Sequence, residues 1–208
     1  MLSFERDNST TLSAPPALTG GFVQADTLTA TRQEWRKQLL QRRRDMPPAE
    51  RAHADAVLDA QLRAALDQID AGPLGFYWPI QAEFDARPAV TAWLAQGQGR
   101  AAALPVVIAR HQPVRFRHWV PGSLMQAAGF GTSIPTAGEW LAPTVLVIPL
   151  VGFDDAGYRL GYGGGYYDRT LAALAPRPHT IGVGFAACRL ASIDPQPHDL
   201  KLDQVLAA

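Results

Sequence analysis

Apolar residues recur at intervals of three and four in several segments of the chain, which is typical of helices with one buried face. In residues 28–44 this spacing places Trp35 and Leu39 on the same side. The pattern predicts further helices at residues 48–69, 86–95 and 166–174. Pro47 and Pro48 separate the first two helices, because proline cannot continue a helix but is favoured at its first position.

Short apolar segments bounded by glycine and proline predict strands at residues 74–78, 100–109, 113–120, 144–150 and 180–185. Residues 144–150 are almost entirely apolar, which is typical of a parallel strand covered on both faces. Strands alternating with helices predict one α/β domain, with an open, mostly parallel sheet flanked by helices on both faces. Ligands of such sheets bind at the carboxyl ends of the strands.

The first 27 residues are rich in serine, threonine, proline and glycine and lack a sustained apolar period. This composition predicts a flexible N-terminal extension, followed by the domain at residues 28–208. A chain of 208 residues is long enough for one domain with a substantial core.

Charge and composition exclude several classes of partner. Equal numbers of acidic and basic residues argue against nucleic-acid binding, which depends on neutralising phosphates. No apolar segment approaches the roughly 18–20 residues of a membrane-spanning helix. The single cysteine, Cys188, excludes an internal disulfide, and its apolar neighbours favour packing over catalysis. We expect a cytoplasmic monomer that acts on small molecules, without nucleic acid or membrane partners.

The most unusual segment is residues 159–169, RLGYGGGYYDR. A strand, a glycine-rich loop and a helix start leave backbone N–H groups and the positive end of a helix dipole facing one point, which suits a phosphate. A plain tight turn explains the glycines equally well. Asp168 either complements the helix dipole or holds a metal ion.

Residues 146–169, LVIPLVGFDDAGYRLGYGGGYYDR, resemble the signature of the 5-formyltetrahydrofolate cyclo-ligase family. Weaker similarity continues over most of the chain from about residue 31. The resemblance implies an ATP- and magnesium-dependent ligase that converts 5-formyltetrahydrofolate to 5,10-methenyltetrahydrofolate and releases ADP and phosphate.

The resemblance also implies a nucleotide and metal site. Arg159 and Asp168 would be catalytic, and Asp168 and Asp199 would hold magnesium. The residues implied to contact ATP are Arg32, Arg36, Arg159, Leu160, Gly161, Tyr162, Gly163, Gly164, Gly165, Tyr166 and Tyr167. Arg32 stands where the family has lysine, and Tyr162 stands where many relatives have arginine. For the adjacent residues 42–44, all arginine, we favour a solvated helix face.

Binding of the reduced folate is implied for Trp78, Glu83, Tyr162, Gly163, Gly164, Gly165 and Tyr166. Two explanations remain open for Glu83, which is either an acid near the start of the helix at residues 86–95 or a ligand contact. Trp78 lines the same pocket or packs in the core, and Tyr166 and Tyr167 contact folate or pack.

Other functional classes remain possible from the residues alone. A sugar-phosphate or CoA-handling enzyme would bind an anion at the same strand ends without needing ATP and magnesium. A non-catalytic α/β module would use residues 161–165, the glycine segment, only as a turn.

Overall fold

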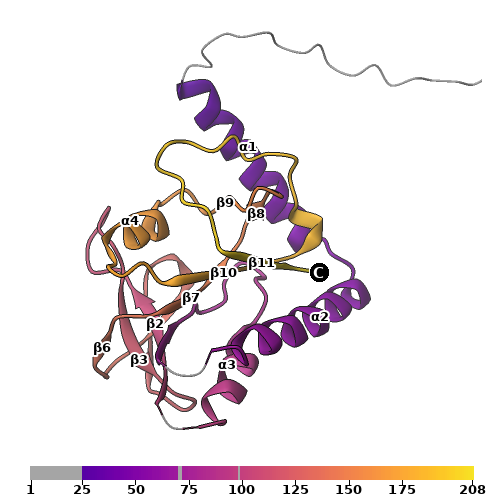
Figure 1. Cartoon of the computed structure of the whole chain (residues 1–208). Helices are drawn as coiled ribbons and strands as arrows, with labels where there is room; N and C mark the ends of the chain where they lie inside the picture. Colours follow the sequence, from indigo (N-terminus) through magenta and orange to yellow (C-terminus); the bar gives the residue numbers. More distant parts are fainter. Residues whose placement is uncertain (1–24, 70–71, 98) are drawn as a thin grey trace, which may run out of the picture.

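Seven strands form the central sheet of the computed structural model, which describes residues 25–69, 72–97 and 99–208 (Figure 1). The strand order is β11-β10-β7-β1-β2-β3-β6. The strands are β1 (Gly72–Gly75), β2 (Arg100–Val106), β3 (Arg115–Trp119), β6 (Trp140–Leu141), β7 (Val145–Pro149), β10 (His179–Gly184) and β11 (Gln204–Ala207). The first five strands in the sheet order are parallel, whereas β3 runs antiparallel to both of its neighbours, β2 and β6. The predicted α/β class and mostly parallel sheet are confirmed.

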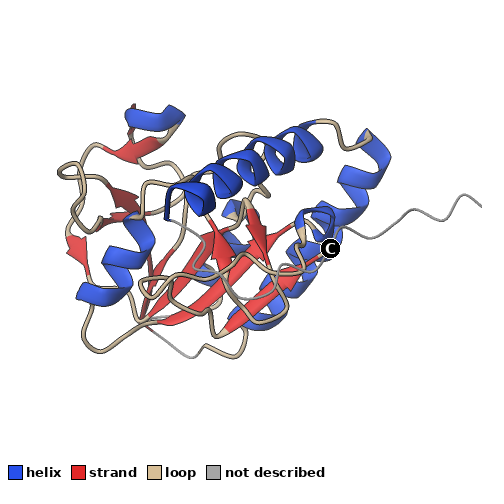
Figure 2. Cartoon of the chain, turned by 90° about the horizontal axis from the view of Figure 1, so that it is seen from above, coloured by secondary structure: helices blue, strands red, loops and turns tan. Residues whose placement is uncertain are grey.

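Helices cover both faces of this sheet, as predicted. They are α1 (Ala25–Arg44), α2 (Pro48–Leu66), α3 (Arg87–Leu94) and α4 (Tyr166–Ala173). Val145 and Val147 of β7 share one apolar cluster with α1, α2 and α3. Leu146 and Ile148 share the other cluster with Leu171 of α4, because successive side chains of a strand point to opposite faces. Figure 2 shows the strands in the middle and the helices around them.

Two small hairpins extend from the sheet. One pairs β4 (Met125–Ala127) with β5 (Ser133–Pro135), and a 3-10 turn at Gly129–Gly131 joins them. The other pairs β8 (Gly152–Phe153) with β9 (Arg159–Leu160). The glycine segment therefore follows β9, and not β7 directly as its sequence position suggested. A second 3-10 turn lies at Ala186–Cys188.

Chain order reverses between β1 and β7, because β1 leads to β2 on one side and β7 leads to β10 on the other. Such a switch point opens a crevice at the carboxyl ends of the two strands, where α/β proteins bind ligands. Glu83 follows β1, and the glycine segment follows β7 through the β8–β9 hairpin. The topology therefore brings these two predicted site segments together.

The predicted strand ends differ by a few residues from the observed ones. The segment 100–109 ends as β2 at Val106, beyond which Val107 and Ile108 are exposed. Pro105 lies inside β2, but beyond Ala103, the last residue paired with β1. The Phe76 N–H still donates to the Ala103 carbonyl, but Pro105 has no N–H and cannot continue this parallel ladder. Residues 1–24 of the predicted extension lie outside the described residues, and its last three residues belong to α1. No helix in the described part of the chain is long and apolar enough to cross a membrane.

Candidate functional site

A cleft of about 200 Å³ lies beside the glycine segment. Every residue predicted to contact ATP or magnesium lines it. The lining residues are Arg32, Arg36, Pro149, Arg159, Leu160, Gly161, Tyr162, Gly163, Gly164, Gly165, Tyr166, Tyr167, Asp168, His198 and Asp199. A larger hollow of about 820 Å³ beside α2 and β11 is lined by none of these predicted residues, and its one arginine is Arg189. The smaller cleft is therefore the candidate site.

The backbone of the glycine segment is open toward the cleft. Gly163 and Gly165 have φ values of 89° and 63°, in the left-handed region that favours glycine. Gly165 is also the N-cap of α4. Among the described residues, none accepts a hydrogen bond from the N–H groups of residues 162–165. These donors and the helix dipole form a cradle suited to an anion.

Arg36 adds positive charge to this cradle. Its Nε donates to the carbonyl oxygen of Gly161 at 2.7 Å. Burial, and then the charge of Arg32, lower the pKa of Arg36, and Asp199 partly offsets this. Three guanidinium groups and two carboxylates line the cleft, which leaves one net positive charge when His198 is neutral. The electrostatics of the cleft therefore favour a phosphate group.

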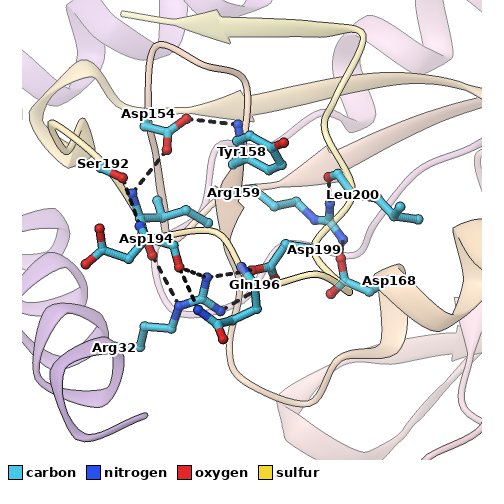
Figure 3. Close-up of polar contacts among 12 residues, drawn as sticks. Arg32, Asp154, Tyr158, Arg159, Asp168, Ser192, Asp194, Gln196, Asp199 and Leu200 are labelled. Carbon is cyan, nitrogen blue, oxygen red and sulfur yellow. Dashed lines mark hydrogen bonds and ion pairs between the residues drawn. The ribbon is translucent and has the colours of Figure 1, made fainter. Parts of the chain in front are cut away.

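Arg159 and Asp168 form an ion pair at one side of the cleft (Figure 3). Nη2 of Arg159 lies 2.5 Å from Oδ1 of Asp168, and Nη1 donates to the Leu200 carbonyl at 2.8 Å. The Arg159 side chain is 5% exposed and that of Asp168 is 23% exposed. The pair thus fixes the Asp168 carboxylate from the protein side and leaves it accessible from the cleft.

Arg32 anchors the segment that contains Asp199 (Figure 3). Its guanidinium donates to the carbonyl oxygens of Ile193 and Asp194 and lies 2.5 Å from Oδ2 of Asp199. Burial alone would raise the pKa of Asp199, but the hydrogen bonds from Arg32 and the Gln196 N–H outweigh it and lower the pKa. Arg32 therefore orders one wall of the cleft, whereas the sequence predicted a phosphate contact. Whether it also reaches a phosphate stays a prediction.

We expect Arg32→Ala to lower the free energy of unfolding at pH 7 by about 2–3 kcal/mol, because it leaves the nearly buried Asp199 without its partner. A lowered carboxyl pKa stabilises the fold above the unfolded pKa, and this stabilisation is lost as the pH falls through the folded pKa. The difference from the unaltered chain should therefore shrink below about pH 4. Urea denaturation at pH 7 and pH 3 measures this.

The matched control is Arg63→Ala on α2. Arg63 is also paired with an aspartate, Asp59, but its side chain is more exposed than that of Arg32. This change should cost about 0.5 kcal/mol or less at either pH. An equal loss in the two variants at pH 7 would contradict the anchoring role of Arg32.

The carboxylates of the cleft suit a magnesium ion that is also bound by the phosphates of a nucleotide. Asp168 and Asp199 are its two carboxylates, and each is paired with an arginine. Among the described residues, no group of three or more histidine, cysteine, aspartate or glutamate side chains is placed to hold a metal. Magnesium commonly binds through one or two carboxylates together with substrate phosphates and water, so this set fits a metal that arrives with a nucleotide. Asp203, four residues after Asp199, does not line the cleft; it accepts hydrogen bonds from the N–H and hydroxyl of Thr180 at the opposite ends of the strands.

Glu83 lies in the loop that follows β1 and is not among the residues that line the cleft. It is 6% exposed, and its carboxylate accepts hydrogen bonds from the Ile80 N–H at 2.8 Å and the Tyr162 hydroxyl at 2.7 Å. Burial raises the pKa of Glu83, and these two bonds only partly offset the increase. Its side chain does not cap α3, whose N-cap is Ala86 without a side-chain bond. The structure therefore gives no support to the helix-capping explanation, and a contact between Glu83 and the folate stays a prediction.

Comparison with known proteins identifies the family. Residues 28–208 match the sequence profile of the 5-formyltetrahydrofolate cyclo-ligase family. The chain belongs to this family. It is 31% identical over 190 residues to the 5-formyltetrahydrofolate cyclo-ligase of Mycolicibacterium smegmatis, an alignment that covers 85% of this chain and 93% of the relative.

Two solved structures are similar to this chain. A 5,10-methenyltetrahydrofolate synthetase from Mycoplasma pneumoniae superposes with a TM-score of 0.69 at 27% identity, over 84% of this chain and 96% of the other. The synthetase from Aquifex aeolicus gives a TM-score of 0.68 at 24% identity, over 85% and 89%, and supports the fold. Cyclo-ligases are ligases that use ATP as a co-substrate, so the chain is an enzyme of this class.

The prediction for Arg43, which lies near the cleft, was wrong. Residues 42–44 were expected to form a solvated face, but Arg43 is only 2% exposed. It donates to Gln81, Leu150 and Tyr162. The signal was its position seven residues after Arg36, which places both on the same side of α1.

Trp78 and Cys188 both lie outside the cleft. Trp78 does not line the cleft; it packs beside the main core, and the Arg87 guanidinium lies 4.4 Å from its ring centre. Its role in folate binding stays a prediction. Cys188 is buried, and burial raises the pKa of its thiol, as expected of a packing residue.

Proposed function

We propose that the chain catalyses the ATP- and magnesium-dependent cyclisation of 5-formyltetrahydrofolate to 5,10-methenyltetrahydrofolate, with release of ADP and phosphate. The formyl oxygen attacks the γ-phosphorus of ATP, and ADP leaves. The resulting iminium phosphate is attacked by the N10 nitrogen of the folate. N10 loses its proton, and the carbon–oxygen bond breaks to release phosphate.

The observation that carries this proposal is that two sites of different character lie next to each other at the switch point of the sheet. One is the positively charged cleft with unpaired loop N–H groups, and the other is the buried carboxylate of Glu83. The Tyr162 hydroxyl joins them at 2.7 Å from Glu83. Phosphoryl transfer depends mainly on positioning and charge neutralisation, and such an arrangement supplies both.

Each group has a distinct role in this proposal. The N–H groups of residues 161–165, with Arg36, bind the phosphates of ATP. Arg159 orients Asp168 toward them and compensates its charge. Glu83 accepts hydrogen bonds from N–H groups of the reduced folate and so orients its formyl group. Magnesium, held by Asp168 and Asp199, would neutralise charge on the phosphate oxygens. Because one chain carries all these groups, we propose that a monomer is active.

The direct test follows absorbance in the near ultraviolet, where the methenyl product absorbs strongly and 5-formyltetrahydrofolate does not. The full chain is mixed with 5-formyltetrahydrofolate and magnesium, with and without ATP, and ADP is measured in parallel. We expect absorbance to rise only with ATP, with one ADP formed for each methenyl group. Product without ATP, or no product at all, would refute the proposal. A chelator arm, in which EDTA should stop turnover, tests the metal requirement.

A further inference from the structure

A continuous line of hydrogen bonds joins three segments that are far apart in the sequence. Nη2 of Arg43 donates to the Tyr162 hydroxyl oxygen at 2.7 Å, and the Tyr162 hydroxyl donates to Oε1 of Glu83 at 2.7 Å. Arg43 lies on α1, Tyr162 in the glycine segment and Glu83 in the loop after β1. A guanidinium donor and a carboxylate acceptor polarise the hydroxyl between them, which strengthens both bonds.

Arg43 is a fixed end of this line. Its Nε donates to the Gln81 carbonyl at 2.9 Å and its Nη1 to the Leu150 carbonyl at 3.2 Å. With three hydrogen bonds and almost no exposed surface, its guanidinium has one available position. Arg43 therefore holds the Tyr162 hydroxyl beside the Glu83 carboxylate.

The loop that carries Glu83 is strained and is held by arginines. Gln81 and Ala82 have φ values of 48° and 56°, which non-glycine residues rarely adopt. Arg51 donates to the carbonyls of Ala82 and Glu83 at 3.0 and 2.9 Å, and Arg43 holds that of Gln81. Strain of this kind persists only where surrounding contacts maintain it, and it concentrates at functional sites.

Tyr162 is the member of this line that belongs to the phosphate cradle. It lies between Gly161 and Gly163, and 42% of its surface is exposed. Within the described part of the chain, its hydroxyl makes the only side-chain hydrogen bond between the cradle and Glu83. A phosphate bound at the glycine segment would therefore contact the same loop that carries the hydroxyl bonded to the Glu83 carboxylate.

We propose that Tyr162 is a positioning residue that couples the two substrate sites, so that nucleotide bound at the glycine segment tightens binding of reduced folate at Glu83. This inference rests on the proposed function, because it takes Glu83 as the folate contact. Coupling of this kind is reciprocal, so folate tightens nucleotide binding by the same factor. Glu83 keeps acceptor capacity for folate, since each carboxylate oxygen has two lone pairs and Tyr162 and Ile80 use one each.

The pH dependence of kcat/KM provides a readout of the bond between Tyr162 and Glu83, in addition to binding measurements. The charged and titratable groups that face its loop are Arg43, Arg51, Tyr77, Asp85, Tyr162 and Tyr167. Burial raises the pKa of Glu83, and the Tyr162 hydrogen bond lowers it. Removing that hydroxyl should raise the pKa of Glu83 further. Less carboxylate is then present at mildly acidic pH, so the acidic limb of the kcat/KM profile should move to higher pH.

The test compares the unaltered chain with Tyr162→Phe, which removes only the hydroxyl. Calorimetry measures 5-formyltetrahydrofolate binding with and without the β,γ-imido analogue of ATP, which prevents turnover. We expect the analogue to tighten folate binding at least about fivefold in the unaltered chain and less than about twofold in the variant. The acidic limb of its pH profile should also move to higher pH.

The matched control is Tyr158→Phe, which removes a hydroxyl with no hydrogen bond among the described residues and no place in the cleft. It should keep both the coupling and the pH profile, and thermal melting checks that both variants fold. Equal coupling in the unaltered chain and in Tyr162→Phe would overturn this inference, and so would the absence of coupling in the unaltered chain. If the unaltered chain forms product, the proposed function stands in either case. An unaltered chain that forms no product would overturn the proposed function as well.

Discussion

Asp168→Asn is expected to lower kcat by about 10²–10³-fold, the range found when one charge-stabilising group is removed from an active site. Its carboxylate lies in the cleft beside the glycine segment and is held by Arg159. Asparagine retains an oxygen that can accept the Arg159 hydrogen bond but loses the negative charge that a metal needs. Steady-state kinetics over a range of magnesium concentrations should show a higher requirement for the metal.

The fold should tolerate this change. We expect the free energy of unfolding to fall by about 1 kcal/mol or less, because Arg159 keeps its bond to Leu200 and a polar partner at position 168. Asp155→Asn provides the control, since Asp155 pairs with Arg189 outside the cleft and is 74% exposed. It should leave turnover unchanged. Turnover of Asp168→Asn equal to that of this control would rule out a charged role for Asp168.

Local sequence patterns predicted the fold well where one physical rule dominates. The apolar segment at residues 144–150 is a parallel strand buried on both faces, and the helical spacing after Gly165 gives α4. The antiparallel pairing of β3 with β2 and β6 was not predicted, because alternation of side chains indicates a strand but not its direction. The short β8–β9 hairpin was also missed, since its two-residue strands have no period of their own.

The site was predicted for residues close in sequence and less well for contacts across the fold. The glycine segment carries its own signal, and its residues all line one cleft. The partners of Arg32 are 161 to 167 residues away, so nothing near it in sequence indicates that it anchors the segment before Asp199. Arg43 is similar, because its neighbouring arginines are exposed and only tertiary contacts distinguish it. Long-range hydrogen bonds of buried arginines are therefore the part of this site that local pattern does not reveal.

Gly163→Ala is expected to weaken ATP binding by about 10–100-fold, the loss of one or two charge-assisted hydrogen bonds. At a φ of 89° an alanine is strained, and its Cβ would lie 3.3 Å from Cζ of Arg36. The loop N–H groups and Arg36 would both have to shift, and these are the groups assigned to the phosphates. Calorimetric titration with the imido analogue of ATP measures the effect without turnover.

Gly122→Ala separates strain from binding, because Gly122 has a φ of 87°, lies away from the cleft and has open space where a Cβ would be placed. Each variant should lose about 1–2 kcal/mol of stability from the left-handed backbone conformation. Only Gly163→Ala should lose affinity for the nucleotide analogue. If both variants bind it as tightly as the unaltered chain, the glycine segment is a turn and not a phosphate cradle, and the nucleotide must be held elsewhere in the crevice.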